Sequence, residues 1–297
     1  MSSYEYRTDF ANERKLDGIT NDVLDVREAH YDNCTLKIIH IYKEDTNLNS
    51  KVGTYYSITF DDLSNHDVRS EVSDVLVECL HEMFDKYDLH GKHCLVVGLG
   101  NRFVVADALG SEVCKKILVT SHLDDEREQH DVSEVMSITP GVMGQTGIES
   151  SDMIQGICIK TKPDFIIVID ALATKSTNRI NKMVQLSDIG IAPGSGVGNT
   201  RKAIDQDSLG IPVLVIGVAT VVDVWSIVRE SIEKGLEFEK IVLKDEQQEE
   251  LFESIRNQSD ETLIVTPREM DADLEHLSEM IAQAVNISLN PKLFNSK

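Results

Sequence analysis

Two apolar runs, each followed by a carboxylate, are the strongest feature of the hydrophobic pattern along this chain. Residues 164–170 read DFIIVID and continue with ALA, and residues 94–100 read CLVVGLG before a loop that carries Asp107. Apolar runs without alternation are typical of strands that a parallel sheet buries on both faces. Open α/β sheets bind their ligands at the carboxyl ends of such strands, so Asp107 and Asp170 form the candidate site.

Shorter segments predict the remaining elements. Strands are expected at residues 36–42, 53–60, 116–120, 134–138, 183–186, 211–217 and 263–265. Helices are expected at 67–86, 106–115, 172–182 and 221–234, from Ser150 or Ser151 onward, and after a start formed by Thr266, Pro267 and Glu269. Strands that alternate with helices predict a three-layer α/β fold, with a largely parallel central sheet and helices on both faces.

The chain is expected to form one folded unit with an arm in front of it. Residues 1–25 are polar and weakly patterned, which predicts an N-terminal arm, and residues 26–297 are expected to form a single α/β domain. The strands at 36–42 and 53–60 are expected to form a hairpin or meander at its periphery. Residues 239–260 are mostly charged and only weakly helical.

Composition restricts the partners and the compartment. The 297 residues carry a formal net charge of −22, which argues against direct binding to nucleic acid or an anionic membrane, because both need a basic face. Five scattered cysteines without a CxxC pair suggest a reducing compartment. The start of the chain has no apolar signal-peptide core, and no apolar run approaches the roughly 20 residues of a membrane span. We therefore expect a cytoplasmic protein.

Two glycine clusters, at residues 140–147 and 193–199, have two open interpretations. They form tight turns at strand ends, or they let the backbone approach a ligand closely. A separate GLG at residues 98–100 is not a dinucleotide motif, because Phe103 stands where GxGxxG needs its third glycine. The cluster at 193–199 has a glycine at every second position and no preceding βα turn of the right form, and no GxxxxGK[ST] occurs in the chain. Ser195 is not within GxSxG, so a nucleophile elbow is unsupported. The candidate oxyanion or substrate residues of these clusters are Gly144, Gly147, Gly194, Ser195 and Gly196.

No metal or cofactor is expected. His81-Glu82 lacks the second histidine of HExxH, and the nine histidines form no ligand-spaced cluster. Both candidate aspartates also have ordinary structural explanations. Asp107 is explained as a charge near a helix N-terminus, and Asp170 as an Asx-turn that closes its strand. The pattern alone leaves these alternatives open.

Longer motifs resemble one known family over nearly the whole chain. Four of them are RTDFA at 7–11, VVGLGN at 96–101, ADALG at 106–110 and DALA at 170–173. Further matching segments are PGVMGQTGIE at 140–149, PDFII at 163–167, QLSDIGI at 185–191, PGSGVGN at 193–199, Gly217 with TVVD at 220–223, and VTP at 265–267. The chain thus resembles the germination proteases of spore-forming bacteria, which are endopeptidases that degrade small acid-soluble spore proteins.

The resemblance implies an atypical aspartic endopeptidase with a fold similar to that of the hydrogenase-maturation endopeptidases. Its two essential aspartates correspond to Asp107, before ALG, and to Asp170, which opens DALA. Family members are made in the forespore as zymogens that cut themselves near the N-terminus. Residues 7–13 resemble the sites that the family cuts, so cleavage is expected between Asp9 and Phe10. We also expect a homo-oligomer, located in the spore core.

This chain departs from the family pattern in two places. Val105-Ala106 stands where a Thr-Pro pair usually precedes the first aspartate, which changes the stiffness of the loop but keeps the carboxylate. The region between about residues 235 and 262 looks shorter than in other members. Contacts that this region makes with substrate or subunits elsewhere are therefore in question for this chain.

The expected mechanism uses the aspartates as a carboxyl pair. One, ionised, takes a proton from the attacking water, and the other, protonated, donates to the carbonyl oxygen or the leaving amine. The sequence leaves open which aspartate has which role. Two rival classes remain. One is a metal-dependent maturation endopeptidase, against which the missing ligand histidine counts, and the other is a non-catalytic binding protein, against which the intact aspartates count.

Overall fold

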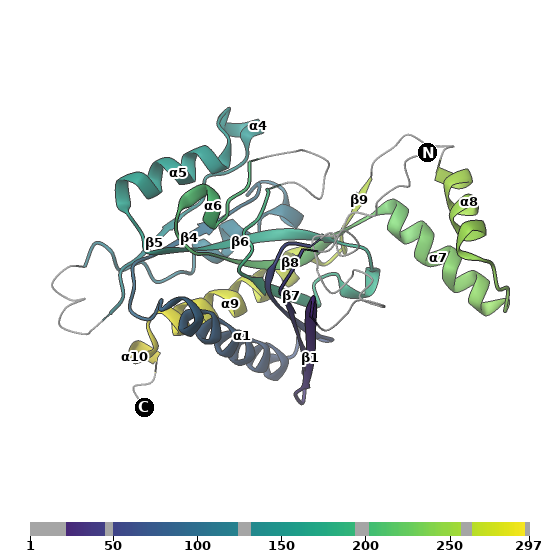
Figure 1. Ribbon diagram of the computed structural model, residues 1–297, viewed down its shortest axis with the longest axis horizontal. Coiled ribbons are helices and arrows are strands. Elements are labelled where there is room, and N and C mark those ends of the chain that lie inside the picture. Colours follow the sequence, from purple (N-terminus) through teal and green to yellow (C-terminus); the bar gives the residue numbers. More distant parts are fainter. Residues whose placement is uncertain (1–21, 45–49, 124–131, 194–201, 257–262, 295–297) are drawn as a thin grey trace.

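In the described part of the chain, a nine-stranded mixed sheet forms the middle layer of the molecule (Figure 1). The computed structural model describes residues 22–44, 50–123, 132–193, 202–256 and 263–294. Along the sheet the strands follow the order β1-β2-β3-β7-β8-β6-β4-β5, and β9 pairs with β8. Their bounds are Leu24–His30 (β1), Cys34–Ile41 (β2), Gly53–Phe60 (β3), Cys94–Gly98 (β4), Val135–Ile138 (β5), Phe165–Thr174 (β6), Met183–Ser187 (β7), Val213–Asp223 (β8) and Ile264–Val265 (β9).

The parallel part of the sheet contains β8, β6, β4 and β5, whereas β7, β3, β2 and β1 extend it with antiparallel pairs. The sheet as a whole is therefore mixed. In β6, Phe165, Ile167 and Ile169 enter the core cluster on one face. Ile166 and Val168 enter the cluster on the other face. Burial on both faces explains why this strand reads as a continuous apolar run.

Helices cover both faces of the sheet, which confirms the predicted layers (Figure 1). One face carries α1 (His66–Tyr87), α2 (Leu109–Cys114) and α9 (Met270–Leu289), and the other carries α5 (Ser150–Thr161) and α6 (Gln206–Leu209). The shorter helices are η2 (Val105–Asp107), α4 (Met143–Thr146), η3 (Thr177–Arg179) and α10 (Pro291–Phe294). None of the helices in the described part of the chain is long and apolar enough to cross a membrane.

Strand β1 was not predicted, and it includes residues 24 and 25 of the expected arm. It pairs with β2 in antiparallel register from Leu24 opposite Ile41 to His30 opposite Thr35. Only Leu24 is buried, and most of the strand is exposed. Backbone pairing at a sheet edge holds this strand, and only a short apolar alternation at Leu24 and Val26 marks it in the sequence.

Strands β6 and β8 both continue beyond their predicted ends. They stay paired as far as Thr174 opposite Val222, with β8 ending at Asp223. The predicted helix over residues 172–182 is therefore wrong, because backbone pairing with β8 takes the place of local helical hydrogen bonds. The helix expected from residue 221 begins at Val224 instead, after Asp223 as its N-cap.

Two further predictions are wrong. Residues 116–120 form no strand, and the side chain of Asn286 in α9 holds this segment by hydrogen bonds to its backbone. The last long helix begins at Met270 rather than directly after Thr266. The Thr266 hydroxyl donates to the carbonyl oxygen of Thr220, 3.0 Å away, so it is engaged in a tertiary contact and does not cap a helix.

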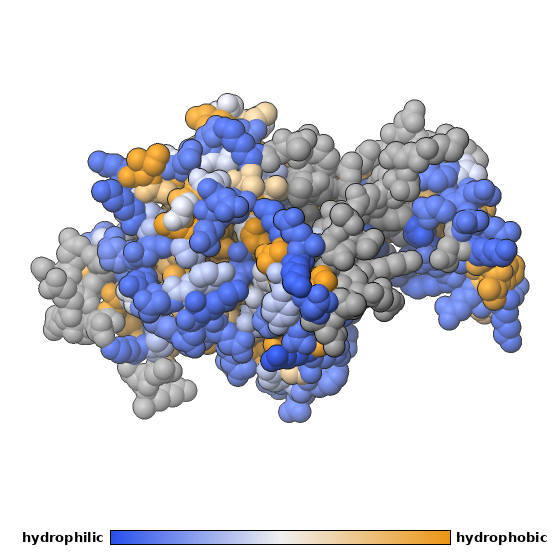
Figure 2. Space-filling model, viewed as in Figure 1, coloured by the Kyte–Doolittle hydropathy of each residue, from blue (hydrophilic) through white to orange (hydrophobic). Residues whose placement is uncertain are grey.

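Helices α7 (Val224–Phe238) and α8 (Asp245–Arg256) project away from the sheet (Figure 1). Helix α8 lies within the segment that was expected to be weakly helical. Trp225 and Phe252 join the two helices edge to face, with 6.3 Å between ring centroids. Val242, between the helices, is 94% exposed, and Figure 2 shows an apolar patch at this end of a mostly hydrophilic surface.

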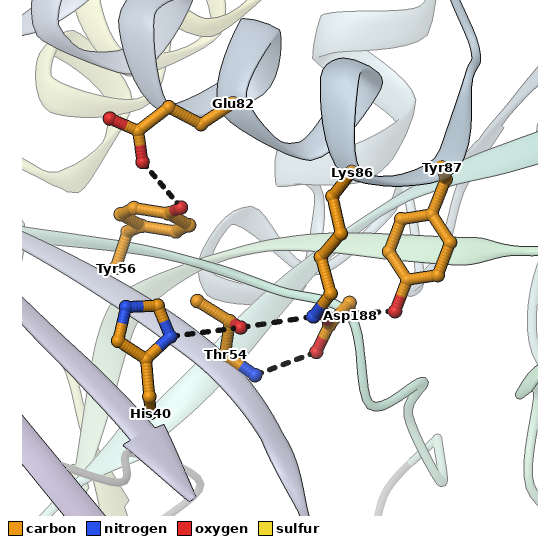
Figure 3. Close-up of polar contacts among 7 residues, drawn as sticks. All are labelled: His40, Thr54, Tyr56, Glu82, Lys86, Tyr87 and Asp188. Atoms are coloured by element: carbon orange, nitrogen blue, oxygen red, sulfur yellow. Dashed lines mark hydrogen bonds and ion pairs between the residues drawn. The ribbon is translucent and has the colours of Figure 1, made fainter.

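Asp188, directly after β7, joins helix α1 to the antiparallel part of the sheet (Figure 3). Its side chain is only 2% exposed and pairs with the ammonium of Lys86 at 2.6 Å. The carboxylate also accepts hydrogen bonds from the Thr54 N–H of β3 at 2.8 Å and the Tyr87 hydroxyl at 3.0 Å. Burial and the adjacent charge of Asp188 raise the pKa of Tyr87. Three donors from two elements thus hold this buried charge in place.

Candidate active site

Asp107 and Asp170 line the same cavity, which has a volume of about 470 Å³. It lies at the carboxyl edge of the parallel strands, where the loop after β4 meets β6, β8 and β9. Among the described lining residues, only these two aspartates have ionisable side chains. Much of the remaining wall is apolar and includes Leu99, Val142, Leu172, Ile191 and Ile264.

Asp170 is held within a regular strand. It is 7% exposed, and its Oδ1 accepts a hydrogen bond from the Ala171 N–H at 2.9 Å. Because β6 continues to Thr174, the aspartate does not close its strand as an Asx-turn would. In the strand pairing, Asp170 lies opposite Gly217 of β8. A Cβ on Gly217 would overlap the side chain of Leu172, which lines the cavity.

Asp107 reaches the cavity because the chain turns back tightly after β4. Gly100 has a φ of +99°, and a Cβ there would overlap the carbonyl oxygen of Asp107. Gly98 and Gly110 make a similar close contact, since a Cβ on Gly98 would overlap the Gly110 carbonyl. The Asn101 N–H donates to Asp107 Oδ2 at 2.8 Å and orients the half-buried carboxylate.

The glycine clusters reach the cavity only in part. Gly141 and Val142 of the first cluster line it, whereas Gly144 and Gly147 are not among its described lining residues. Gly147, with a φ of +72°, follows helix α4 as its C-cap. Pro193 lines the cavity, but Gly194, Ser195 and Gly196 lie outside the described residues, as do Asp9 and Phe10.

Three hydroxyl residues of the cavity wall, Ser150, Thr220 and Thr266, were not among the sequence candidates for the site. Ser150, the first residue of α5, donates to the Gly141 carbonyl at 2.9 Å and so ties this helix to the glycine loop. Thr220 of β8 is fully buried, and its Oγ1 has no hydrogen-bond partner within the described part of the chain. The TVVD motif at 220–223 was its only signal in the sequence.

The described residues contain no group of three or more histidine, cysteine, aspartate or glutamate side chains that could hold a metal ion. What they do contain is two carboxylates that share a cavity at the carboxyl edge of an α/β sheet, an arrangement suited to a hydrolase. A family model described as germination protease matches residues 5–240. The chain belongs to this family and is a spore-germination endopeptidase.

Curated relatives named germination protease match most or nearly all of the chain. The protein of Bacillus pumilus is 35% identical and aligns with 99% of this chain and 95% of its own length. That of Oceanobacillus iheyensis is 34% identical, with coverages of 97% and 91%. That of Clostridium tetani is 34% identical, with coverages of 83% and 81%.

A solved structure, the [NiFe] hydrogenase maturation protease HycI from Thermococcus kodakarensis, aligns with 66% of this chain and 95% of its own. The sequence identity is 16% and the TM-score 0.35. The α/β fold of this chain is defined by its own sheet order and by the helices on both faces of the sheet.

Proposed function

We propose that this endopeptidase degrades small acid-soluble spore proteins during germination, with Asp107 and Asp170 activating the water that attacks the peptide bond. The observation that supports the proposal is their common cavity, because both aspartates are among its lining residues. Family membership supports the peptide-hydrolase chemistry. The proposed place of action is the spore core.

The chemistry requires one carboxylate in each protonation state. The ionised aspartate takes a proton from water as the water oxygen attacks the carbonyl carbon. The protonated aspartate donates its proton to the carbonyl oxygen or to the departing amine. Two carboxyl groups at one site separate into an acid and a base, because two adjacent negative charges repel each other. Much of the cavity wall is apolar, and surroundings of low polarity strengthen such an interaction.

The loop at Gly141 and Val142 is a candidate for binding the developing oxyanion. Both residues line the cavity, and the hydrogen bond from Ser150 to the Gly141 carbonyl fixes the loop against α5. Backbone N–H groups in such a position stabilise negative charge as it forms. Gly144, Gly147 and residues 194–196 remain predictions from the sequence.

The test compares Asp107→Asn and Asp170→Asn with Asp85→Asn, a matched change on the exposed face of α1. Each variant is first treated with immobilised wild-type protein, so that a failure to mature is not mistaken for a failure to cleave. Cleavage of a small acid-soluble spore protein should fall at least about 10³-fold in the two cavity variants. Near-normal turnover in either folded cavity variant rejects the aspartate pair.

The metal-dependent rival is tested by exhaustive dialysis against a chelator. The aspartate mechanism predicts unchanged turnover after dialysis, because neither proton transfer passes through a metal. Loss of turnover that one specific divalent metal restores would assign the cavity to a metal-dependent reaction instead.

We also propose that this chain is a precursor that cuts itself between Asp9 and Phe10. The support is the resemblance of residues 7–13 to the sites that the family cuts. Mildly acidic incubation followed by mass spectrometry should give a new chain that begins at Phe10, and Asp107→Asn alone should give none. Processing at another bond, or equal processing of that variant, would contradict the proposal.

A further inference from the structure

Two apolar residues of the cavity wall are strongly exposed to solvent. Among the described lining residues, Val104 and Ile264 are the large apolar ones with about half of their surface accessible, at 49% and 47%. Leu99 and Leu172, which also line the cavity, are buried. A molecule that enters the cavity from solvent can therefore contact Val104 and Ile264 without any rearrangement of the protein.

Backbone hydrogen bonds hold Val104 in the turn that carries Asp107. The Val104 N–H donates to the Asn101 carbonyl at 2.9 Å, and the Asp107 N–H donates to the Val104 carbonyl at 2.8 Å. Val104 and Asp107 both line the cavity. A ligand group that contacts the Val104 side chain is therefore close to one of the two proposed catalytic carboxylates.

Pairing with β8 holds Ile264 at another part of the wall. Ile264 lies opposite Asp223, and the next residue of β9, Val265, lies opposite Val222. Successive side chains of a strand point to opposite faces of the sheet, so Val265 is directed away from the face that carries the Ile264 side chain. Accordingly, Ile264 is a described lining residue of the cavity and Val265 is not.

The chemistry of these two side chains indicates what they bind. Apolar surface that is exposed in a cavity is stabilised when an apolar group of a ligand covers it and removes it from water. A polar group in the same place would lose its water without gaining a hydrogen bond from either side chain. We propose that Val104 and Ile264 are specificity-determining residues of this endopeptidase, which bind large apolar side chains of the substrate near the scissile peptide bond. This inference rests on the function proposed for Asp107 and Asp170.

The test couples changes in the enzyme to changes in the substrate. Mass spectrometry first identifies the bond that wild type cuts in a small acid-soluble spore protein. Each large apolar residue within three positions of that bond, which is about 10 Å of extended chain, is then replaced by alanine in turn. We expect Val104→Ala and Ile264→Ala each to lower kcat/KM about tenfold for the unaltered substrate. For a substrate that lacks the matching apolar side chain, the same variant should stay within about twofold of wild type.

Val105→Ala and Val265→Ala are the matched controls. Both residues are direct neighbours of the proposed ones and are 39% exposed, but neither is a described lining residue of the cavity. Their kcat/KM should stay within about twofold of wild type for every substrate. Val104→Thr keeps the shape of the side chain but adds a hydroxyl, so it should behave like Val104→Ala and replaces that variant should it fail to fold. Ile264→Val keeps an apolar side chain and should retain most of the wild-type preference.

Several results would overturn the inference. One is a substrate that has no large apolar residue within the three positions, and another is a loss of kcat/KM that is equal for the unaltered and the alanine substrates. Equal losses in the control variants would also overturn it. Unchanged kcat/KM together with a changed sedimentation coefficient would assign Val104 and Ile264 to a contact between copies of this chain instead.

Failure of this inference is distinct from failure of the proposed function. The coupling is measured in variants that keep both aspartates. Equal losses for all substrates alongside inactive aspartate variants reject only the role of Val104 and Ile264, whereas active aspartate variants reject the carboxyl pair.

Discussion

Asp170 and Asp188 both have buried side chains and belong to the same sheet, one within β6 and the other directly after β7, yet their surroundings differ. Asp188 receives an ammonium group, a backbone N–H and a phenol hydroxyl (Figure 3). Asp170 faces a cavity that also contains Asp107. The two aspartates lie on either side of β8, one in β6 and the other directly after β7.

From this difference we expect a structural role for Asp188 and propose a catalytic role for Asp170. A buried carboxylate that accepts hydrogen bonds from several donors holds together the elements that carry those donors. Removal of this charge is therefore expected to lower the stability of the fold. A carboxylate that faces a substrate-sized cavity beside a second carboxylate can exchange protons with a bound molecule. Sequence motifs include both residues, so only the surroundings distinguish their roles.

The largest expected effect on stability comes from Asp188→Asn. The substitution removes the charge that pairs with Lys86 and should lower the unfolding free energy by about 3 kcal/mol. The kcat/KM of the folded fraction should stay near wild type. Asp170→Asn should show the opposite, with a change in stability below about 1 kcal/mol, because an amide oxygen can still accept the Ala171 N–H. Urea unfolding and turnover of both variants test this contrast, and equal losses of stability would contradict it.

A smaller loss of unfolding free energy is expected when the turn that carries Asp107 is disturbed. A Cβ at Gly110 would lie 2.5 Å from backbone atoms of Leu99, which cannot move away, so α2 and Asp107 must shift. We expect Gly110→Ala to cost about 1–3 kcal/mol and to lower kcat/KM at least about tenfold.

Gly156→Ala in α5 is the control for this glycine, because a Cβ there meets nothing within 4 Å. It should stabilise the helix by up to about 1 kcal/mol and leave turnover unchanged. Unchanged turnover in Gly110→Ala would show that this close contact does not position Asp107.

The smallest effect concerns the pH dependence of stability around Asp188. The pKa of Tyr87 is raised in the folded protein by burial and by the charge of Asp188. Above roughly pH 10 the unfolded chain loses this phenolic proton while the folded chain keeps it, so the folded state binds more protons and its stability falls as pH rises. Tyr87→Phe should therefore lose less stability between roughly pH 10 and 11 than wild type does. An identical pH slope in chemical unfolding would contradict this effect.

The positions of both cavity aspartates could be predicted because buried apolar runs mark parallel strands, and ligands bind at the carboxyl ends of such strands. The extension of β6 and β8 could not be predicted, since it depends on pairing between residues about 50 apart. The same pairing passes over Thr220, because Leu172 pairs with Ala219 and Ala173 with Val221. Strand β1 escaped prediction because its side chains are mostly exposed and its apolar alternation ends after Leu24 and Val26. A sequence signal for a helix N-cap fails where the side chain makes a tertiary hydrogen bond instead. The Thr266 hydroxyl, for example, donates to the Thr220 carbonyl and does not cap a helix.

A double-mutant cycle in kcat/KM tests most directly whether Asp107 and Asp170 act as a pair. It compares wild type, Asp107→Asn, Asp170→Asn and the variant with both changes, each treated with immobilised wild-type protein first. Residues that act as one catalytic unit show strongly non-additive losses. We predict that each single change lowers kcat/KM at least about 10³-fold and that the double change lowers it no further. Losses that multiply, or one single variant with near-normal kcat/KM, would contradict a shared catalytic role.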